Sequence, residues 1–317
     1  MKKNFFPSLC LFLCLLTACG APAEPQGSAG TSEPASATAV TFVDDLGRQV
    51  TVDRPQRVAV LIGSFADIWC LAGGKDQLVA AADDAWTQFD LDLSDQVVNL
   101  GGVKNTNLER LMAAEPDFVI ASSNTAANVE LLETFEQAGI NAAYFMVASF
   151  DEYLHMLDIC TQITGCSEHY QRYGVDIQDQ VDAARARADG SAPRVLYVRA
   201  TGSSCKVKNS QDSVLGEMLA DLGCRNIADS AESLLEELSM EVILQQDPEH
   251  IFVVIQGSDP AKAQDLLDKT LLSNPAWSTL TAVKEGRFHV MDPNLYNLKP
   301  NARWGEAYEK LADILYS

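Results

Sequence analysis

The sequence predicts an α/β fold made of two similar lobes with parallel-type central sheets, joined by a single long linker helix, with a cleft between the lobes. Three observations support this fold class. From residue 40 onward, short β-rich runs alternate with stretches of helical periodicity. The second half of this region repeats features of the first half. Between the halves, residues 150–189 contain no strand pattern.

The N-terminus predicts a lipoprotein signal peptide over residues 1–19. Two lysines precede an apolar run at 9–16, which is too short to span a bilayer permanently. The run closes with Leu16-Thr17-Ala18-Cys19, which resembles a bacterial lipobox, so we expect lipidation at Cys19. A cleaved signal with an unrelated cysteine is the alternative. Residues 20–39 are rich in Ala, Pro, Ser and Gly and predict a flexible tether, with an end-to-end distance of about 25 Å.

The two lobes follow from two sets of predicted strands. The first set defines an N-terminal α/β lobe over residues 40–149, and the second defines a C-terminal α/β lobe over residues 190–317. Residues 150–189 have the apolar spacing of a helix, with a break expected near Gly165, and they form the predicted linker helix. The predicted strands are 58–62, 78–82, 118–121 and 142–145 in the first lobe, and 195–198, 251–255 and 288–291 in the second.

An internal repeat relates the lobes. Asn107 and Glu109 open a predicted helix that runs to Pro116 and then a strand, and Ser239 and Glu241 open the same arrangement before Pro248. Asn107 and Ser239 are residue types that cap helix N-termini, and each glutamate lies in the first turn. The glutamate precedes the proline by seven residues in both copies. Because ligands of open α/β sheets lie outside the carboxyl ends of the strands, the loops there should line the cleft.

Composition excludes several classes of function. The chain has a formal net charge of -21, which argues against nucleic acid as a partner and against a membrane association other than through the lipid anchor. Five cysteines follow Cys19, so a full disulfide framework is excluded, although a Cys160–Cys166 bridge stays possible. No Cys or His spacing predicts a metal site, and no motif predicts a cofactor. We expect a monomer.

Positive charge gathers in two segments of the second lobe. Residues 191–211 contain four basic residues and no acidic one, and residues 293–303 contain two basic residues and no acidic one. Both segments include loops that follow predicted strands, so we expect Lys206, Lys208, Lys299 and Arg303 to include the contacts to an anionic ligand. Solvated surface positions are the alternative for each of them, and Arg194 is expected to cap a strand edge.

Several stretches resemble the ABC-importer binding proteins for iron–siderophore complexes, haem and cobalamin. The resemblance covers about residues 41–317, and it depends on the order and spacing of its parts. It implies a rigid linker helix and modest lobe closure. It also implies that one glutamate on each lobe docks onto arginines of the permease, which by position are Glu109 and Glu241. Complementing the helix dipole is the alternative role for these glutamates. The stretches are Asp45-Leu46-Gly47-Arg48, Pro55-Gln56-Arg57-Val58, Asn107-Leu108-Glu109 with Pro116-Asp117, 271–277 and 282–290.

The resemblance implies a small anionic metal chelate as the ligand. A ferric siderophore is the first expectation, and a corrinoid or haem is the alternative. Phe65 and Trp86 of the first lobe and Tyr296 of the second are aromatic residues near expected cleft loops, where they could cover such a ligand. Tyr296 is also the axial ligand that haem would need. Ser123 and Asn124, which follow a first-lobe strand, could donate hydrogen bonds.

An extracellular enzyme is the hypothesis from a different class. The sequence lacks Gly-x-Ser-x-Gly, His-Glu-x-x-His and Gly-x-x-x-x-Gly-Lys, the motifs of common hydrolases and nucleotide-binding enzymes. We therefore expect a binding protein with no catalytic residues.

Overall fold

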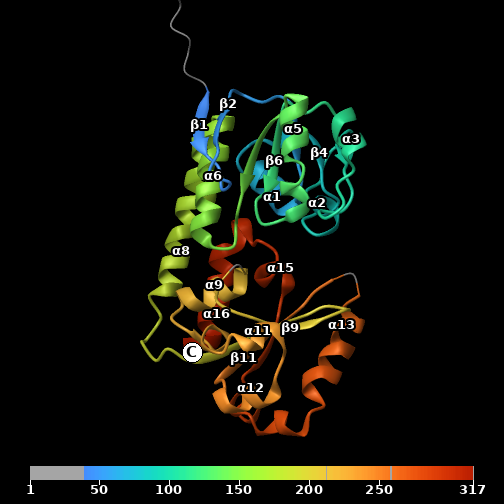
Figure 1. Ribbon diagram of the computed structural model, residues 1–317. Helices are drawn as coiled ribbons and strands as arrows, with labels where there is room; N and C mark the ends of the chain where they lie inside the picture. The colour runs from blue at the N-terminus through green and yellow to red at the C-terminus, as the bar shows by residue number, and fades with distance from the viewer. Residues whose placement is uncertain (1–38, 212, 258, 317) are drawn as a thin grey trace, which may run out of the picture. The chain divides into compact units, whose positions relative to one another are not determined.

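The computed structural model describes residues 39–211, 213–257 and 259–316 (Figure 1). The predicted signal peptide with Cys19, and residues 20–38 of the predicted tether, lie outside the described residues. Within them, no helix is long and apolar enough to cross a membrane.

The N-terminal lobe is built on a parallel sheet with the strand order β5-β4-β3-β6-β7. All five residues of β6 are buried, which explains why the strand reads as a continuous apolar run. An antiparallel hairpin that the sequence did not predict, β1 (Val40–Val43) with β2 (Gln49–Val52), precedes the sheet. The strands are β3 (Val58–Val60), β4 (Leu78–Ala81), β5 (Val98–Asn99), β6 (Phe118–Ser122) and β7 (Asn141–Phe145). The helices are α1 (Gly63–Leu71), η1 (Lys75–Gln77), α2 (Asp84–Thr87), α3 (Leu108–Ala113), α4 (Ala126–Val129) and α5 (Leu132–Ala138).

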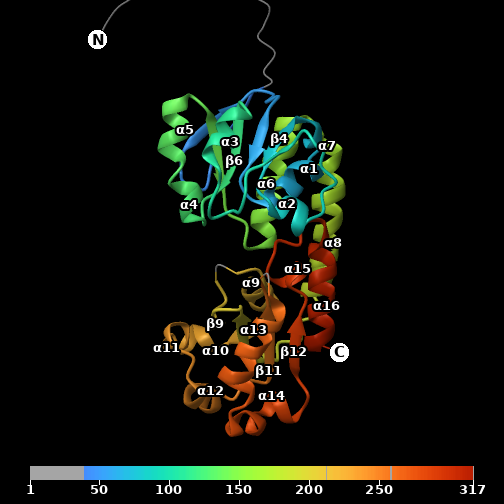
Figure 2. The same cartoon turned by 90° about the vertical axis from the view of Figure 1, so that its right-hand side faces the viewer.

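The C-terminal lobe has the parallel strand order β10-β8-β11-β12, and β9 adds an antiparallel pairing to β8. Figure 2 shows β9 and α13 from the side. The strands are β8 (Arg194–Ala200), β9 (Cys205–Lys208), β10 (Arg225–Asn226), β11 (His250–Ile255) and β12 (Phe288–Met291). The helices are α9 (Val214–Asp221), α10 (Ile227–Ser230), α11 (Ser233–Glu236), α12 (Met240–Gln246), α13 (Pro260–Leu267), η3 (Asp268–Leu272), η4 (Pro275–Thr279), α14 (Thr281–Lys284), α15 (Pro293–Tyr296), η5 (Asn301–Arg303) and α16 (Trp304–Tyr316).

The internal repeat is present in three dimensions. The order β4-β3-β6-β7 in the first lobe corresponds to β10-β8-β11-β12 in the second. Asn107 and Ser239 cap α3 and α12 as predicted, each accepting a backbone N–H from three residues ahead. The backbone N–H of Arg57 donates to Asp117 at 3.0 Å, and that of Arg194 donates to Glu249 at 2.9 Å. The two lobes therefore use the same contact to join the starts of two neighbouring strands, β3 with β6 and β8 with β11.

The predicted break near Gly165 divides the linker region into two helical segments. Helix α6 (Phe150–Thr164) ends at Gly165, whose φ of +78° suits glycine. A second helical run follows as α7 (Ser167–Tyr170), η2 (Gln171–Val175) and α8 (Asp176–Arg185). The hydroxyl of Tyr153 donates to the backbone carbonyl of Tyr173 at 2.8 Å, so the segments pack together. The region predicted as the linker helix, 150–189, thus contains two helical segments, and the second ends at Arg185.

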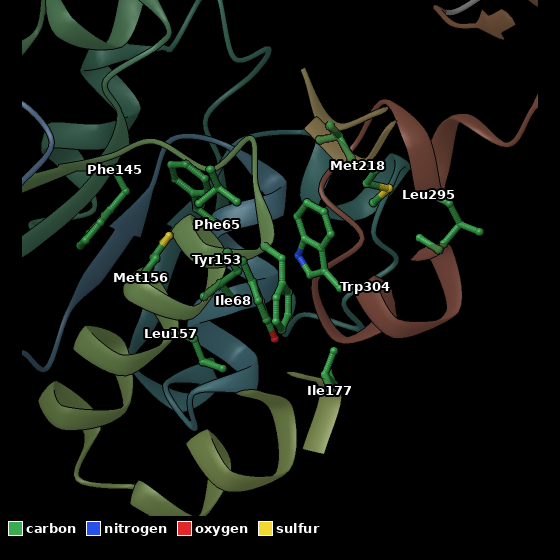
Figure 3. Close-up of a cluster of buried hydrophobic side chains, with 14 of the residues drawn as sticks. Phe65, Ile68, Phe145, Tyr153, Met156, Leu157, Ile177, Met218, Leu295 and Trp304 are labelled. Atoms are coloured by element: carbon green, nitrogen blue, oxygen red, sulfur yellow. The ribbon is translucent and has the colours of Figure 1, made fainter. Parts of the chain in front are cut away.

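One hydrophobic core contains residues of both lobes. Figure 3 shows its centre, where Trp304 at the start of α16 lies beside Tyr153 of α6. Trp304 is fully buried, and its ring centroid lies 5.9 Å from that of Phe150 and 6.4 Å from that of Tyr153. Helices α8 and α16 pack together and complete this core. Each sheet has a further core on its other face.

A buried asparagine joins the lobes next to this core. Asn301 has no exposed surface, and its side-chain amide donates to the Ser64 carbonyl and to the Asp67 carboxylate of α1, both at 2.8 Å. Asn301 adopts a φ of +51°, a region in which asparagine is tolerated better than most residues. Burial raises the pKa of Asp67, and the hydrogen bond from Asn301 acts against that rise.

The cysteines form no disulfide in the described part of the chain. All five that follow the tether are free thiols, so the possible Cys160–Cys166 bridge is absent. Burial raises the pKa of Cys160 well above its ordinary value, and that of Cys224 to about 12. Such thiols are unreactive at neutral pH, which gives them a packing role.

A stacked histidine pair at the start of β11 and β12 makes stability depend on pH. His250 Nδ1 lies 3.3 Å from His289 Nε2, and burial together with the neighbouring ring lowers the pKa of His250 to about 4. Because the unfolded chain takes up a proton near pH 6.5, stability is full above that pH and falls as the pH drops toward 4. Between pH 7 and 5 we therefore expect a falling thermal midpoint, and a shallower fall in His250→Gln. Equal slopes in both proteins would contradict this role.

Candidate functional site

A cavity of about 340 Å³ lies between residues of the two lobes. The first lobe contributes residues that follow β6 and β7, and the second contributes the ends of β8 and β9, the start of α9 and the segment around α15. These are the carboxyl ends of parallel strands in both lobes, as the topology rule requires. The lining residues are Asn124, Val147, Ala148, Tyr197, Arg199, Lys208, Ser213, Val214, Tyr296, Asn297 and Lys299.

The charge of this cavity is entirely positive among its lining residues. Arg199, Lys208 and Lys299 contribute side chains, and no aspartate or glutamate lines the cavity. Arg199 is half-buried at the end of β8, and its guanidinium donates to Asn297 Oδ1 at 3.4 Å. Three cations in the wall of a strongly acidic protein favour an anionic occupant.

Lys299 is a half-buried member of this set of cations. Burial lowers its pKa, and the carboxylates of Asp84 and Glu152 act in the opposite direction. Burial also raises the pKa of Asp84, which accepts the backbone N–H of Gly63 at 2.8 Å. A partly desolvated ammonium gains more from a bound anion than a surface lysine does, because water screens the interaction less.

Ser213 supplies a polar group for which the structure provides no partner. Ser213 is 7% exposed, and its Oγ makes no hydrogen bond to any of the described residues. Ser213 stands at the N-cap of α9, where a serine oxygen usually accepts a helix N–H, yet no such bond forms. A buried hydroxyl without a partner is costly, so a ligand that bonds to it would be stabilised. No pattern in the sequence indicated this residue.

Three of the residues predicted to bind the ligand line the cavity: Lys208, Tyr296 and Lys299. Tyr296 is only 3% exposed, and its hydroxyl donates to the Ala307 carbonyl at 2.9 Å. Its ring can contribute to the wall, but its hydroxyl is engaged within the protein. Asn124, suggested as a hydrogen-bond donor, also lines the cavity.

Four other predicted contacts lie elsewhere. Lys206 shares a face of β9 with Lys208, two residues away, but it is exposed and does not line the cavity. Arg303 is exposed and pairs with Glu306 at 2.7 Å. The remaining two are aromatic residues of the first lobe.

These two aromatic predictions are corrected by packing. Phe65 is 1% exposed, because helix α1 begins at Gly63, directly after β3, and turns this ring into the core (Figure 3). Trp86 is half-buried on α2 and packs against the same core. Neither residue belongs to the lining of the cavity. The sequence suggested loops at both positions, whereas short helices follow β3 and β4.

The two glutamates expected to contact a permease occupy equivalent positions. Glu109 lies in the first turn of α3, and Glu241 lies in the first turn of α12. Both side chains are exposed, and neither belongs to an ion pair found among the described residues. The geometry leaves both carboxylates accessible from solvent.

No group of three or more His, Cys, Asp or Glu side chains that could hold a metal ion occurs in the described part of the chain. The stacked His250–His289 pair lies at the opposite end of its strands from the carboxyl-end loops.

Comparison with known proteins agrees with this architecture. The family model described as periplasmic binding protein matches residues 58–295. The chain is 23% identical to the uncharacterized ABC transporter substrate-binding lipoprotein YvrC of Bacillus subtilis, over 100% of this chain and 98% of that protein. It is 26% identical to a cobalamin-binding protein of Halobacterium salinarum, over 97% of this chain and 85% of that protein.

A solved structure has the same fold. The siderophore-binding protein BauB, bound to a complex of two acinetobactin molecules and ferric iron, superposes with a TM-score of 0.71 at 17% sequence identity. The alignment covers 88% of this chain and 99% of BauB. The repeated lobes, the cavity between them and the family match lead to one assignment: the chain belongs to the periplasmic binding protein family and is a solute-binding protein of the ABC-importer class.

Proposed function

We propose that this solute-binding protein captures a small anionic ferric chelate outside the cytoplasm and delivers it to the permease of an ABC importer. One observation carries the proposal: the cavity between the lobes is lined by Arg199, Lys208 and Lys299 and by no carboxylate. Ferric complexes of carboxylate or catecholate ligands often keep a net negative charge, and such a charge would be complementary to this wall. The free hydroxyl of Ser213 adds a hydrogen-bond donor for a ligand oxygen.

The cavity favours a ferric chelate over the two alternatives. The three cations of the lining favour a ferric chelate with several negative charges over a corrinoid, whose anionic group is a single phosphate. Haem would need an axial ligand, and the Tyr296 hydroxyl is held by Ala307. No histidine lines the cavity.

The membrane and permease contacts complete the proposal. Lipidation of Cys19 would hold the protein at the outer face of the membrane, as the name of the relative YvrC suggests for that protein. Glu109 and Glu241 would place one carboxylate of each lobe on basic side chains of the permease. The protein would release its ligand chemically unchanged, which distinguishes it from an enzyme.

The first test is a thermal melt of residues 20–317 against ferric citrate, a ferric trihydroxamate, a ferric triscatecholate, haemin and cyanocobalamin. A ligand present at 100 times its dissociation constant stabilises the fold by about 2.7 kcal/mol, a shift of several degrees. We expect one or more ferric chelates to raise the midpoint, and recovery of the same chelate after denaturation. A shift with haemin or cyanocobalamin alone would contradict the proposed ligand class.

Neutralising the cavity cations should weaken ligand binding. We expect Arg199→Gln and Lys299→Gln each to raise the dissociation constant of the ferric chelate about tenfold or more, because charge-assisted contacts contribute about 1.5–3 kcal/mol. Isothermal titration measures the change. Lys284→Gln removes the same charge from an exposed position on α14, outside the cavity lining, and serves as the control. Equal affinities for all three variants and the wild type would place the ligand elsewhere.

A further inference from the structure

A second cavity of about 350 Å³ adjoins the cationic one. Its walls are mostly apolar and include Ile255, Pro260, Pro293 and Leu298, and none of its lining residues is charged. Gln88 of the first lobe completes the lining, so this cavity also lies between residues of both lobes. Leu298 is half-exposed and belongs to none of the buried clusters of the described residues.

The order of the strands places the two cavities side by side. Neighbouring strands β8, β11 and β12 end at the same edge of the sheet. Arg199, near the end of β8, lines the cationic cavity, whereas Ile255 at the end of β11 and Pro293 just after β12 line the apolar one. The cleft therefore changes from cationic to apolar along the sheet edge.

Asn297 is the boundary between the two compartments, because it lines both of them. The residues beside it line different cavities: Tyr296 and Lys299 line the cationic one, and Leu298 lines the apolar one. Arg199 donates to the Asn297 side chain at 3.4 Å and so holds this boundary on the cationic side. A ligand that passes Asn297 would move directly from charged to apolar surroundings.

We infer that the ligand is amphiphilic: an anionic, metal-chelating head occupies the cationic cavity, and one apolar arm extends past Asn297 onto Ile255, Pro293 and Leu298. This inference rests on the proposed function and specifies its ligand class. A compact, fully charged chelate would leave the apolar compartment wet, and a charged arm would find no opposite charge in its lining. An acyl or aryl arm removes those surfaces from water, and its burial adds affinity that the head alone does not have.

The test compares two ferric chelates that share one head group. The first is the ferric complex of a citrate dihydroxamate with two acetyl groups, and the second replaces one acetyl group by an octanoyl chain. We expect the octanoyl chelate to bind the wild type about tenfold or more tightly, since each buried methylene contributes about 0.8 kcal/mol before ordering costs. We expect Leu298→Asn to remove most of this advantage and to change the affinity for the acetyl chelate far less than that for the octanoyl chelate.

The control is Val290→Asn. It replaces an exposed apolar side chain of β12 that lines neither cavity. Equal affinity of the two chelates for the wild type would overturn the amphiphilic assignment while leaving the anionic site intact. If both variants lose the preference for the octanoyl chelate equally, the octanoyl group associates non-specifically with the protein surface. This result would also overturn the amphiphilic assignment. If neither chelate binds and a ligand of another class raises the thermal midpoint, the proposed function itself would be contradicted.

Discussion

We expect the double variant Glu109→Ala, Glu241→Ala to lose all stimulation of the permease ATPase. Its dissociation constant for the ligand should equal that of the wild type. The two carboxylates occupy equivalent helix starts in the two lobes, and they are exposed. If each pairs with a basic side chain of the permease, losing both removes the charge pairs that hold the protein in register over a two-fold partner. Each single variant should retain part of the stimulation.

The measurement is ATP hydrolysis by the importer in proteoliposomes, with ligand-loaded protein added. Glu133→Ala with Glu309→Ala is the control, because it removes two exposed glutamates, one from α5 and one from α16, and changes the net charge equally. Full stimulation by the double variant at Glu109 and Glu241 would exclude the docking role. An equal loss in the control would show that net charge alone accounts for the effect.

Trp304→Ala should destabilise the protein by about 3–5 kcal/mol, the second large effect that we expect. The Trp304 ring is fully buried and packs on Phe150 and Tyr153 of α6 and on Tyr308 of its own helix, with a centroid distance of 6.2 Å to Tyr308. Its removal leaves a cavity in the core that contains residues of both lobes. The loss should therefore affect the whole domain and not one lobe alone.

Urea unfolding followed by far-ultraviolet circular dichroism measures this change. Trp304→Phe, which keeps an aromatic ring, should lose distinctly less stability than the alanine variant. Trp277→Ala shows what the loss of a tryptophan costs in the separate core of the second lobe. Trp277 packs there on Phe288, with a centroid distance of 5.8 Å. A loss below about 1 kcal/mol in Trp304→Ala would contradict the importance of the shared core.

The sequence predicted the central strands well, because buried parallel strands are continuous apolar runs. All seven predicted strands are present within two residues at each end. The strands β5 and β10 have only two residues each and carry no such run. The β9 hairpin was missed because its tight turn, closed by the Thr201 N–H to the Ser204 carbonyl, resembles an ordinary loop in composition. At Gly165 the break was predictable, but the reversal of direction depends on tertiary packing.

The candidate site was predictable in its charge and less so in its geometry. The acid-free segment around β8 and β9 predicted a cationic wall, and Lys208 and Lys299 are part of it. Lys206 lies on the same face of β9 as Lys208 but is exposed and outside the cavity lining, a difference in tertiary surroundings that the sequence does not record. Ser213 lies in the site through the start of α9, a tertiary placement that no local pattern records. The structure adds this residue and Arg199 to the set of contacts to test.

The bond between Asn301 and Ser64 has a consequence for how the chain reaches its folded state. These residues are separated by 237 positions, and the core beside them is completed by α16, the final helix. During synthesis the N-terminal lobe emerges first, yet part of its apolar surface stays uncovered until α16 has been made. Contacts this distant in sequence slow folding. The N-terminal lobe should therefore become stable only when α16 packs beside it.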